Sequence, residues 1–229
     1  MFEELLIEPD RLSAYPQAVI VDCRFSLADP EEGRRLYHAG HIPGAHYLDL
    51  NRDLSGAVGS HGGRHPLPDP HDFAATLARL GIGPTTEVVA YDASRLAFAA
   101  RFWWMMRAVG FRPPRLLNGG YQAWLDSGGA VQSEVPRPTP VPATTVAFAG
   151  CCDIDGLRRA QSEGATVVDA REPRRYQGLE EPIDPVAGHI PGAVNHPWQG
   201  VTDGSGRVLD AAGQRSHWGD TLDLSLIHI

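Results

Sequence analysis

The chain has 229 residues, of which 42% are hydrophobic and 21% charged, a balance typical of globular proteins with a real core. Its net charge of −8 weighs against non-specific nucleic-acid binding, which requires a basic surface. No apolar run approaches the ~18–20 residues of a membrane span, and the acidic start lacks the positive n-region of a secretory signal. Three cysteines are too few and too unevenly spaced for a disulfide framework, so we expect a cytoplasmic protein.

The first half of the chain alternates short apolar runs with helical patterns. Strands are predicted at residues 19–22, 87–91 and 115–117, and helices at residues 72–81, 96–109 and 121–125. The helix at 96–109 is apolar almost all round and carries Trp103 and Trp104, which we expect in the core. This alternation predicts an α/β fold in which helices cover both faces of a parallel sheet.

Prolines at every second position, from Pro136 to Pro142, interrupt this pattern. Alternating prolines cannot form a helix or a central strand, so an extended linker is predicted there. We place the first domain at residues 1–135, the linker at 136–145 and the second domain at 146–229.

Two motifs of the first half recur after the linker. The motif Asp-x-Arg begins at Asp22 and again at Asp169, each time at the end of a predicted strand. The hexapeptide Gly-His-Ile-Pro-Gly-Ala follows each, with its histidine at His41 and at His189. The separation from aspartate to histidine differs by a single position between the two copies. Two motifs at matched spacing indicate an internal duplication.

The second copy is the shorter one. A helix near residues 153–162 and a strand at 166–169 precede its hexapeptide, but the pattern thins out after Trp198. The first copy runs from Asp22 to its loop at Asp92, and the same stretch counted forward from Asp169 would pass the last residue, Ile229. We therefore expect the second domain to be incomplete, that is, truncated.

Further motifs accompany the hexapeptide: Leu67-Pro68, Tyr91-Asp92, Arg101-Phe-Trp103-Trp104 and Leu117-Asn-Gly-Gly-Tyr-Gln-Ala-Trp124. Over about residues 10–218 the chain resembles the tandem rhodanese-type sulfurtransferases, the group that includes thiosulfate and 3-mercaptopyruvate sulfurtransferases. The resemblance implies two tandem rhodanese-like domains, each a parallel sheet flanked by helices. It also implies transfer of a sulfane sulfur from thiosulfate or 3-mercaptopyruvate to a thiophilic acceptor, cyanide or a thiol, with no cofactor.

In that family the first domain is usually inactive, and the second carries a nucleophilic cysteine on a loop before a helix N-terminus. Backbone N–H groups and the positive end of the helix stabilise a thiolate there, which accepts sulfur as a persulfide. Asp92 occupies the equivalent loop position in the first domain, and a carboxylate cannot carry a persulfide. No cysteine follows Cys152. The expected nucleophile is absent, so we assign no catalytic residue.

The resemblance implies one substrate-binding residue. The segment Arg174-Arg175-Tyr176, followed by Glu181-Pro182, is similar to the family segment whose arginine binds the donor anion, and that arginine maps onto Arg175. A guanidinium suits a sulfonate-like or carboxylate group through paired hydrogen bonds. Without the resemblance, a solvated basic pair on a loop is an equally good interpretation.

The remaining polar residues are interpreted as structural. We expect His41 and His189 to bond their own turns or the nearby Asp-x-Arg strands, and the Asp–Arg pairs to anchor those strand ends. Cys23 is predicted to be a core thiol, and Cys151 and Cys152 to be buried or idle. We expect no metal site, because the other histidines lack ligand spacing. These are His38, His46, His61, His65 and His71.

Two functions of different classes remain open. The first is a sulfurtransferase with a small anionic sulfur donor and a thiophilic acceptor, and with neither nucleic acid nor membrane as a partner. The alternative is a non-catalytic rhodanese-like binding or regulatory module, which the missing loop cysteine favours. A phosphatase of the related fold is a distant third, because no sequence feature supports it.

Overall fold

The structure is a computed structural model that describes residues 2–59, 63–182 and 184–219. It divides into two compact units, Met1–Gly150 and Cys151–Ile229. The predicted domain limits stay a prediction, and each unit is described below by itself.

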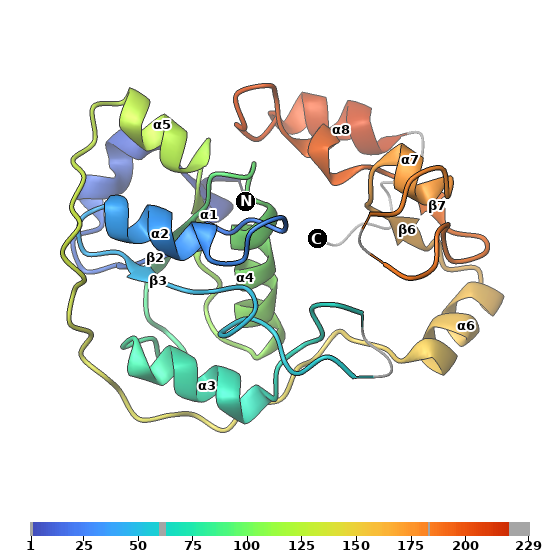
Figure 1. The fold of residues 1–229 in the computed structure, drawn as a ribbon, viewed down its shortest axis with the longest axis horizontal. Coiled ribbons are helices and arrows are strands. Elements are labelled where there is room, and N and C mark those ends of the chain that lie inside the picture. The colour runs from blue at the N-terminus through green and yellow to red at the C-terminus, as the bar shows by residue number, and fades with distance from the viewer. Residues whose placement is uncertain (1, 60–62, 183, 220–229) are drawn as a thin grey trace. The chain divides into compact units, whose positions relative to one another are not determined.

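The first unit is built on a five-stranded sheet in which each pair of neighbouring strands is parallel. Figure 1 shows this unit with helices around its strands. Its strands are β1 (Leu6–Ile7), β2 (Val19–Asp22), β3 (His46–Tyr47), β4 (Val88–Tyr91) and β5 (Arg115–Leu117), in the spatial order β1-β5-β4-β2-β3. All four residues of β4 are buried, as expected for the central strand of a parallel sheet. The predicted α/β fold with a parallel sheet is confirmed.

Helices connect the strands of the first unit. They are α1 (Phe2–Leu5), the 3-10 helix η1 (Pro9–Ala14), α2 (Glu32–Ala39), α3 (Pro70–Arg79), α4 (Ala97–Ala108) and α5 (Gly120–Asp126). The three helices predicted in this half correspond to α3, α4 and α5, with small differences at their ends. Asp69 caps α3 by accepting a hydrogen bond from the N–H of His71, and Pro70 stands at its first position.

Helices flank the sheet because its side chains alternate between two faces. On one face Val89, Tyr91 and Leu117 form a core cluster with Leu12 of η1, against which Tyr121 and Trp124 of α5 pack. Val88 and Ala90 point to the opposite face, and α4 contacts both β4 and β5. The predicted helical layers on both sides of the sheet are therefore present.

The two tryptophans of α4 depart from the sequence-based expectation. The buried residues of this helix are Ala99, Phe102, Met105, Met106 and Ala108, whereas Trp103 and Trp104 are half-buried. Trp104 stacks on Phe148 with ring centroids 6.4 Å apart, and the Arg107 guanidinium lies over the Trp103 ring. The helix is apolar enough to suggest full burial, but smaller side chains form its inner face.

The proline-rich segment packs against the first unit. The Val141 N–H donates to the carbonyl of Ala78 at the end of α3, and the Ala149 N–H donates to the carbonyl of Ala108 at the end of α4. Phe148 stacks on Phe73 with centroids 5.8 Å apart. These contacts explain why the first unit extends to Gly150 rather than ending before the prolines.

The second unit is smaller, and its described residues repeat only part of this plan. Two parallel strands, β6 (Val168–Asp169) and β7 (Val194–Asn195), form its sheet. Its helices are α6 (Ile154–Ser162), α7 (Pro173–Tyr176), the 3-10 helix η2 (Trp198–Val201) and α8 (Ala211–Gly219). The helix and strand predicted before the second hexapeptide are confirmed as α6 and β6, whereas α8 follows where the sequence pattern thins out.

In the part of the chain that the structure describes, no helix has the length and apolar character needed to cross a membrane.

Candidate functional site

The loop after β4 surrounds the carboxylate of Asp92 with backbone N–H groups. Oδ1 accepts from the N–H of Ser94 at 2.7 Å and of Leu96 at 3.0 Å. Oδ2 accepts from the N–H of Phe98 at 2.9 Å and of Ala99 at 3.0 Å, both in the first turn of α4. Asp92 is fully buried. Four N–H donors and a helix N-terminus therefore hold one buried negative charge.

This arrangement requires an unusual backbone. Arg95 and Leu96 both have positive φ, 58° and 68°, which non-glycine residues rarely adopt. The loop also packs tightly on α5: the Tyr121 N–H donates to the Asp92 carbonyl, and a Cβ on Gly120 would lie 2.3 Å from that oxygen. The strain at Arg95 and Leu96 aims the N–H groups inward at a single anion.

Burial raises the pKa of the Asp92 carboxyl above its usual range, and the N–H groups of Ala99, Ser94, Phe98 and Leu96 oppose that rise. Asp92 stands where the resemblance places the family's cysteine, and its own carboxylate occupies the space among the donors. In this loop the four N–H groups are therefore bonded to the chain's own carboxylate rather than to a thiolate.

Asp22 and Arg24 anchor the first copy of the duplicated motif. The Arg24 guanidinium contacts both Asp22 oxygens, the shortest bond being 2.6 Å from Nη2 to Oδ2, and Nη2 also donates to the Gly40 carbonyl at 2.7 Å. The Tyr91 hydroxyl donates to Asp22 Oδ2 at 2.8 Å and accepts from the Ile42 N–H. These bonds tie the ends of β2 and β4 to the hexapeptide, as the sequence predicts.

His41 has a structural partner in the preceding helix. Its Nδ1 lies 2.8 Å from the carbonyl oxygen of Tyr37, and its ring stacks on the Tyr37 ring with centroids 4.0 Å apart. The Tyr37 hydroxyl donates to the Ala45 carbonyl at 2.8 Å. The prediction of a structural histidine is confirmed, but its partner is this helix rather than the turn or the strand.

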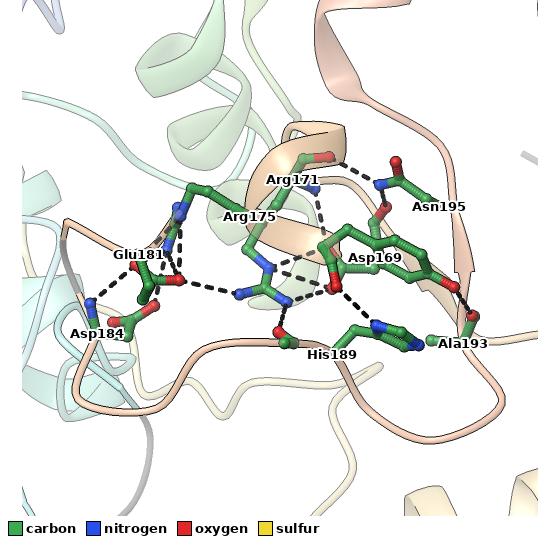
Figure 2. Close-up of polar contacts among 10 residues, drawn as sticks. Asp169, Arg171, Arg175, Glu181, Asp184, His189, Ala193 and Asn195 are labelled. Atoms are coloured by element: carbon green, nitrogen blue, oxygen red, sulfur yellow. Dashed lines mark hydrogen bonds and ion pairs between the residues drawn. The ribbon is translucent and has the colours of Figure 1, made fainter. Parts of the chain in front are cut away.

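The second copy repeats the Asp–Arg, Arg–Gly, His–Tyr and Tyr–Ala bonds of the first (Figure 2). Arg171 Nη2 donates to Asp169 Oδ2 at 2.6 Å and to the Gly188 carbonyl at 2.5 Å. His189 Nδ1 lies 2.7 Å from the carbonyl of Tyr176, and the two rings stack at 3.7 Å. The Tyr176 hydroxyl donates to the carbonyl of Ala193 at 2.7 Å. The Arg171 hydrogen bonds hold the pKa of the Asp169 carboxyl below its usual range.

The matched spacing of the two copies conceals a rearrangement. Tyr37 and Tyr176 occupy equivalent positions, because each stacks on the hexapeptide histidine and bonds the hexapeptide alanine. Yet the first copy has a long stretch from its aspartate to Tyr37 and a short one from there to the histidine, whereas the second copy has the reverse. In the second copy the segment from the aspartate to the tyrosine is shorter and the segment from the tyrosine to the histidine is longer, so the two differences nearly cancel.

The longer segment of the second copy, between Tyr176 and His189, contains acidic residues that bond Arg175. The Arg175 Nε and Nη2 groups bond both oxygens of Glu181 at 2.9–3.2 Å, and Nη2 also bonds Asp184 Oδ2 at 2.8 Å (Figure 2). Glu181 lies 3.5 Å from Arg171 as well. The structure thus places the predicted anion-binding arginine beside the Asp169–Arg171 anchor, with two carboxylates as its partners.

Sequence reasoning named Glu181 only as part of a flanking motif and did not identify Asp184. The signal that could have found it is the group of acids at 180, 181 and 184, which comes soon after two arginines. The first copy has Leu36, which is 43% exposed, in the position before the tyrosine that Arg175 holds in the second copy. This guanidinium therefore belongs to the second copy alone.

The three thiols divide into one buried and two exposed groups. Cys23 is buried in the first unit, as predicted, and burial raises its pKa well above the usual value. Cys151 and Cys152 were predicted to be buried or idle. Both are exposed, so they are not buried thiols, and the prediction that they are idle stays. They lie at the start of the second unit, outside any loop like that of Asp92.

Known proteins are similar to this chain in sequence and in fold. The family model "Rhodanese-like domain" matches residues 8–127. A protein of Pseudomonas aeruginosa named "Probable 3-mercaptopyruvate sulfurtransferase" is 43% identical over 78% of this chain and 64% of its own length. A Mycobacterium tuberculosis protein, provisionally named a thiosulfate sulfurtransferase, is 38% identical over 83% of this chain and 68% of its own.

A solved structure agrees with these matches. The 3-mercaptopyruvate sulfurtransferase from Leishmania major superimposes with a TM-score of 0.81 and 29% identity, over 93% of this chain and 60% of that one. The chain thus spans about two thirds of the length of these relatives. The chain belongs to the rhodanese-like sulfurtransferase family.

Proposed function

We propose that this chain is the scaffold and donor-binding part of a sulfurtransferase. In our proposal that sulfurtransferase moves a sulfane sulfur from thiosulfate or 3-mercaptopyruvate to a thiophilic acceptor, cyanide or a thiol. The names of the relatives support this reaction class, because they specify these two donors. In our proposal Arg175 binds the anionic group of the donor, and the nucleophile is a cysteine of the second domain other than the three present here.

The observation that carries the proposal is the ring of N–H donors around Asp92. Four N–H groups at 2.7–3.0 Å around one negative charge are what a thiolate needs on a loop of this kind. A cysteine in such a ring attacks the donor's sulfane sulfur, the donor leaves as sulfite or pyruvate, and the persulfide then passes its outer sulfur to the acceptor. In the first unit a carboxylate fills the ring, so this unit is the inactive partner.

The test is thiocyanate formation from cyanide with thiosulfate or 3-mercaptopyruvate as donor. We expect this chain alone to be inactive, because Cys23 is buried and the exposed Cys151 and Cys152 lie outside a strand-to-helix loop like that of Asp92. We expect activity to appear when the coding sequence is extended to include a loop cysteine of the second domain. An extended protein that carries such a cysteine and turns over neither donor would contradict the proposal.

A non-catalytic binding module remains the second candidate, since Asp92 replaces the cysteine in the loop of the first unit. The two candidates separate in one measurement, which is turnover by the protein encoded by the complete gene. If the complete gene encodes no loop cysteine and its protein has no sulfurtransferase activity, the binding module is the better description. Turnover by this chain itself, lost on replacing one of its thiols by serine, would exclude it.

A further inference from the structure

The connection between α7 and the second hexapeptide differs from its counterpart in both length and charge. Three residues separate Tyr37 from His41, whereas twelve separate Tyr176 from His189. The added residues include Glu180, Glu181 and Asp184. The arginine that would receive an anion is therefore followed closely by acids of its own chain.

The acids Glu181 and Asp184 hold Arg175 in different ways. The Glu181 side chain is 5% exposed, meets Arg175 through both carboxylate oxygens, and lies near Arg171 as well. The Asp184 side chain is 38% exposed and has one bond to Arg175, from Nη2 at 2.8 Å. Glu181 is thus built into the site, whereas Asp184 contacts the same guanidinium from the solvent side.

The charge balance at this point opposes an anionic ligand. Two arginines, Arg171 and Arg175, face three carboxylates, those of Asp169, Glu181 and Asp184. The cluster therefore carries one net negative charge, and a donor anion would meet repulsion as well as an occupied guanidinium. Asp184 also lines a shallow depression with Arg171 and His189, so its withdrawal would widen the access from solvent to Arg171.

We propose that Asp184 is an internal competitor for the sulfur donor: it occupies Arg175 until the oxyanion of the donor replaces it. The inference rests on the proposed role of Arg175 in donor binding. Glu181 keeps the guanidinium in place throughout, because it is buried and bonded through both oxygens. Asp184 sets how strongly an anion must bind in order to enter, and so acts as a specificity-determining residue.

The experiment measures the Kd of thiosulfate at constant ionic strength from the backbone amide NMR signals of residues 186–190. We expect Asp184→Asn to tighten thiosulfate binding about fivefold, the scale of one exposed ion pair. The matched control is Glu180→Gln, which removes the same charge from the same loop at an exposed pair with Arg174. We expect this control to leave the Kd within about twofold of the parent value, because Glu180 bonds Arg174 and not Arg175.

Three results would overturn the inference or its basis in distinguishable ways. Equal tightening by both variants would mean that general electrostatics, and not competition at Arg175, controls binding. An unchanged Kd in Asp184→Asn, together with loss of binding in Arg175→Gln, would refute the competitor but leave the donor site standing. A Kd that Arg175→Gln does not change would refute the proposed donor site itself.

Discussion

Asp92 occupies a position whose chemistry is defined by its neighbours rather than by its own side chain. The four N–H groups converge on it from positions 94 to 99, where Arg95 and Leu96 adopt positive φ. A backbone under that strain persists only when something compensates for it, and here the compensation is a buried charge with four donors. Removing the charge leaves the donors buried without an acceptor.

We therefore expect Asp92→Ala to destabilise the first unit by about 3 kcal/mol or more, the cost of leaving several buried donors unsatisfied. The measurement is the free energy of unfolding in urea. Asp126→Ala is the matched control, because Asp126 is exposed and bonds only the side chain of Gln122 among the described residues. It should cost no more than about 0.5 kcal/mol. Equal losses in the two variants would show that the N–H ring is not important for stability.

The pKa of the Asp169 carboxyl should depend on Arg171. Because Arg171 lowers the pKa of Asp169 in the folded state, the pair stabilises the second unit at pH values above the pKa of the unfolded chain, which is about 4. That contribution is lost as the pH falls through the lower pKa of the folded state.

In Arg171→Gln we expect the pKa of Asp169 to rise toward its ordinary value, as measured by carbon-13 NMR of the carboxyl group. Arg158→Gln removes a similar charge from an exposed pair with Asp155 and should leave that pKa where it is. A pKa unchanged in Arg171→Gln would mean that the hydrogen bonds of Figure 2 do not persist in solution.

At the scale of elements, the sequence predicted the helices and strands that are long and whose pattern lies within their own residues. Strands β2, β4 and β5 carry apolar runs, and α3 and α4 carry helical patterns with clear ends, so their positions agree with the structure. Strands β1 and β3 have two residues each and contain too little pattern to be recognised. They form because the neighbouring strands β5 and β2 offer free edges, which is tertiary information.

The candidate site was predictable in part for the same reason. The Asp–Arg anchors and the histidines are motifs of fixed composition, and their structural role follows from it. The equivalence of Tyr37 and Tyr176 was not visible, because the two differences in spacing nearly cancel. The bonds from Arg175 to Glu181 and Asp184 depend on how the longer connection folds back, which side-chain spacing alone does not determine.

The first residue of α5, Gly120, should tolerate no side chain. Gly120 has φ +60° and its Cβ would lie 2.3 Å from the Asp92 carbonyl oxygen. Gly110, with φ +78°, would meet nothing within 4 Å. We expect Gly110→Ala to cost about 1 kcal/mol from backbone strain alone, and Gly120→Ala to cost at least about 2 kcal/mol more. Thermal unfolding of the two variants compares them directly, and equal midpoints would contradict the close packing of the two loops.

At the scale of the whole molecule, burial is distributed unevenly. The first unit holds nearly all of the buried apolar side chains, whereas Ala193 is the one buried hydrophobic residue among those described in the second unit. None of the helices α6, α7 and α8 has a buried residue in this part of the chain. Local stability follows buried apolar contact, so the second unit should open first.

Limited proteolysis should therefore leave a fragment that ends near residue 150. The sequence alone predicted an extended linker at residues 136–145, where a protease would be expected to cut, but Val141, Phe148 and Ala149 are bonded or packed against α3 and α4. Mass spectrometry of the resistant core distinguishes the two possible cleavage positions. A core that ends before residue 143 would contradict the packing of the linker, and a resistant second half would contradict the low stability expected from its burial.

The equivalence of Tyr37 and Tyr176 in the two copies has a consequence for protein engineering. The stretch between aspartate and histidine begins and ends on the same bonds in both units, so we expect residues 23–40 and 170–188 to be exchangeable. An ungapped alignment from the aspartates would set Tyr37 opposite Asp184 and would hide this correspondence. A chimera that carries residues 170–188 in the first unit should fold, and it would transplant Arg175 and its acidic loop onto the more deeply buried sheet.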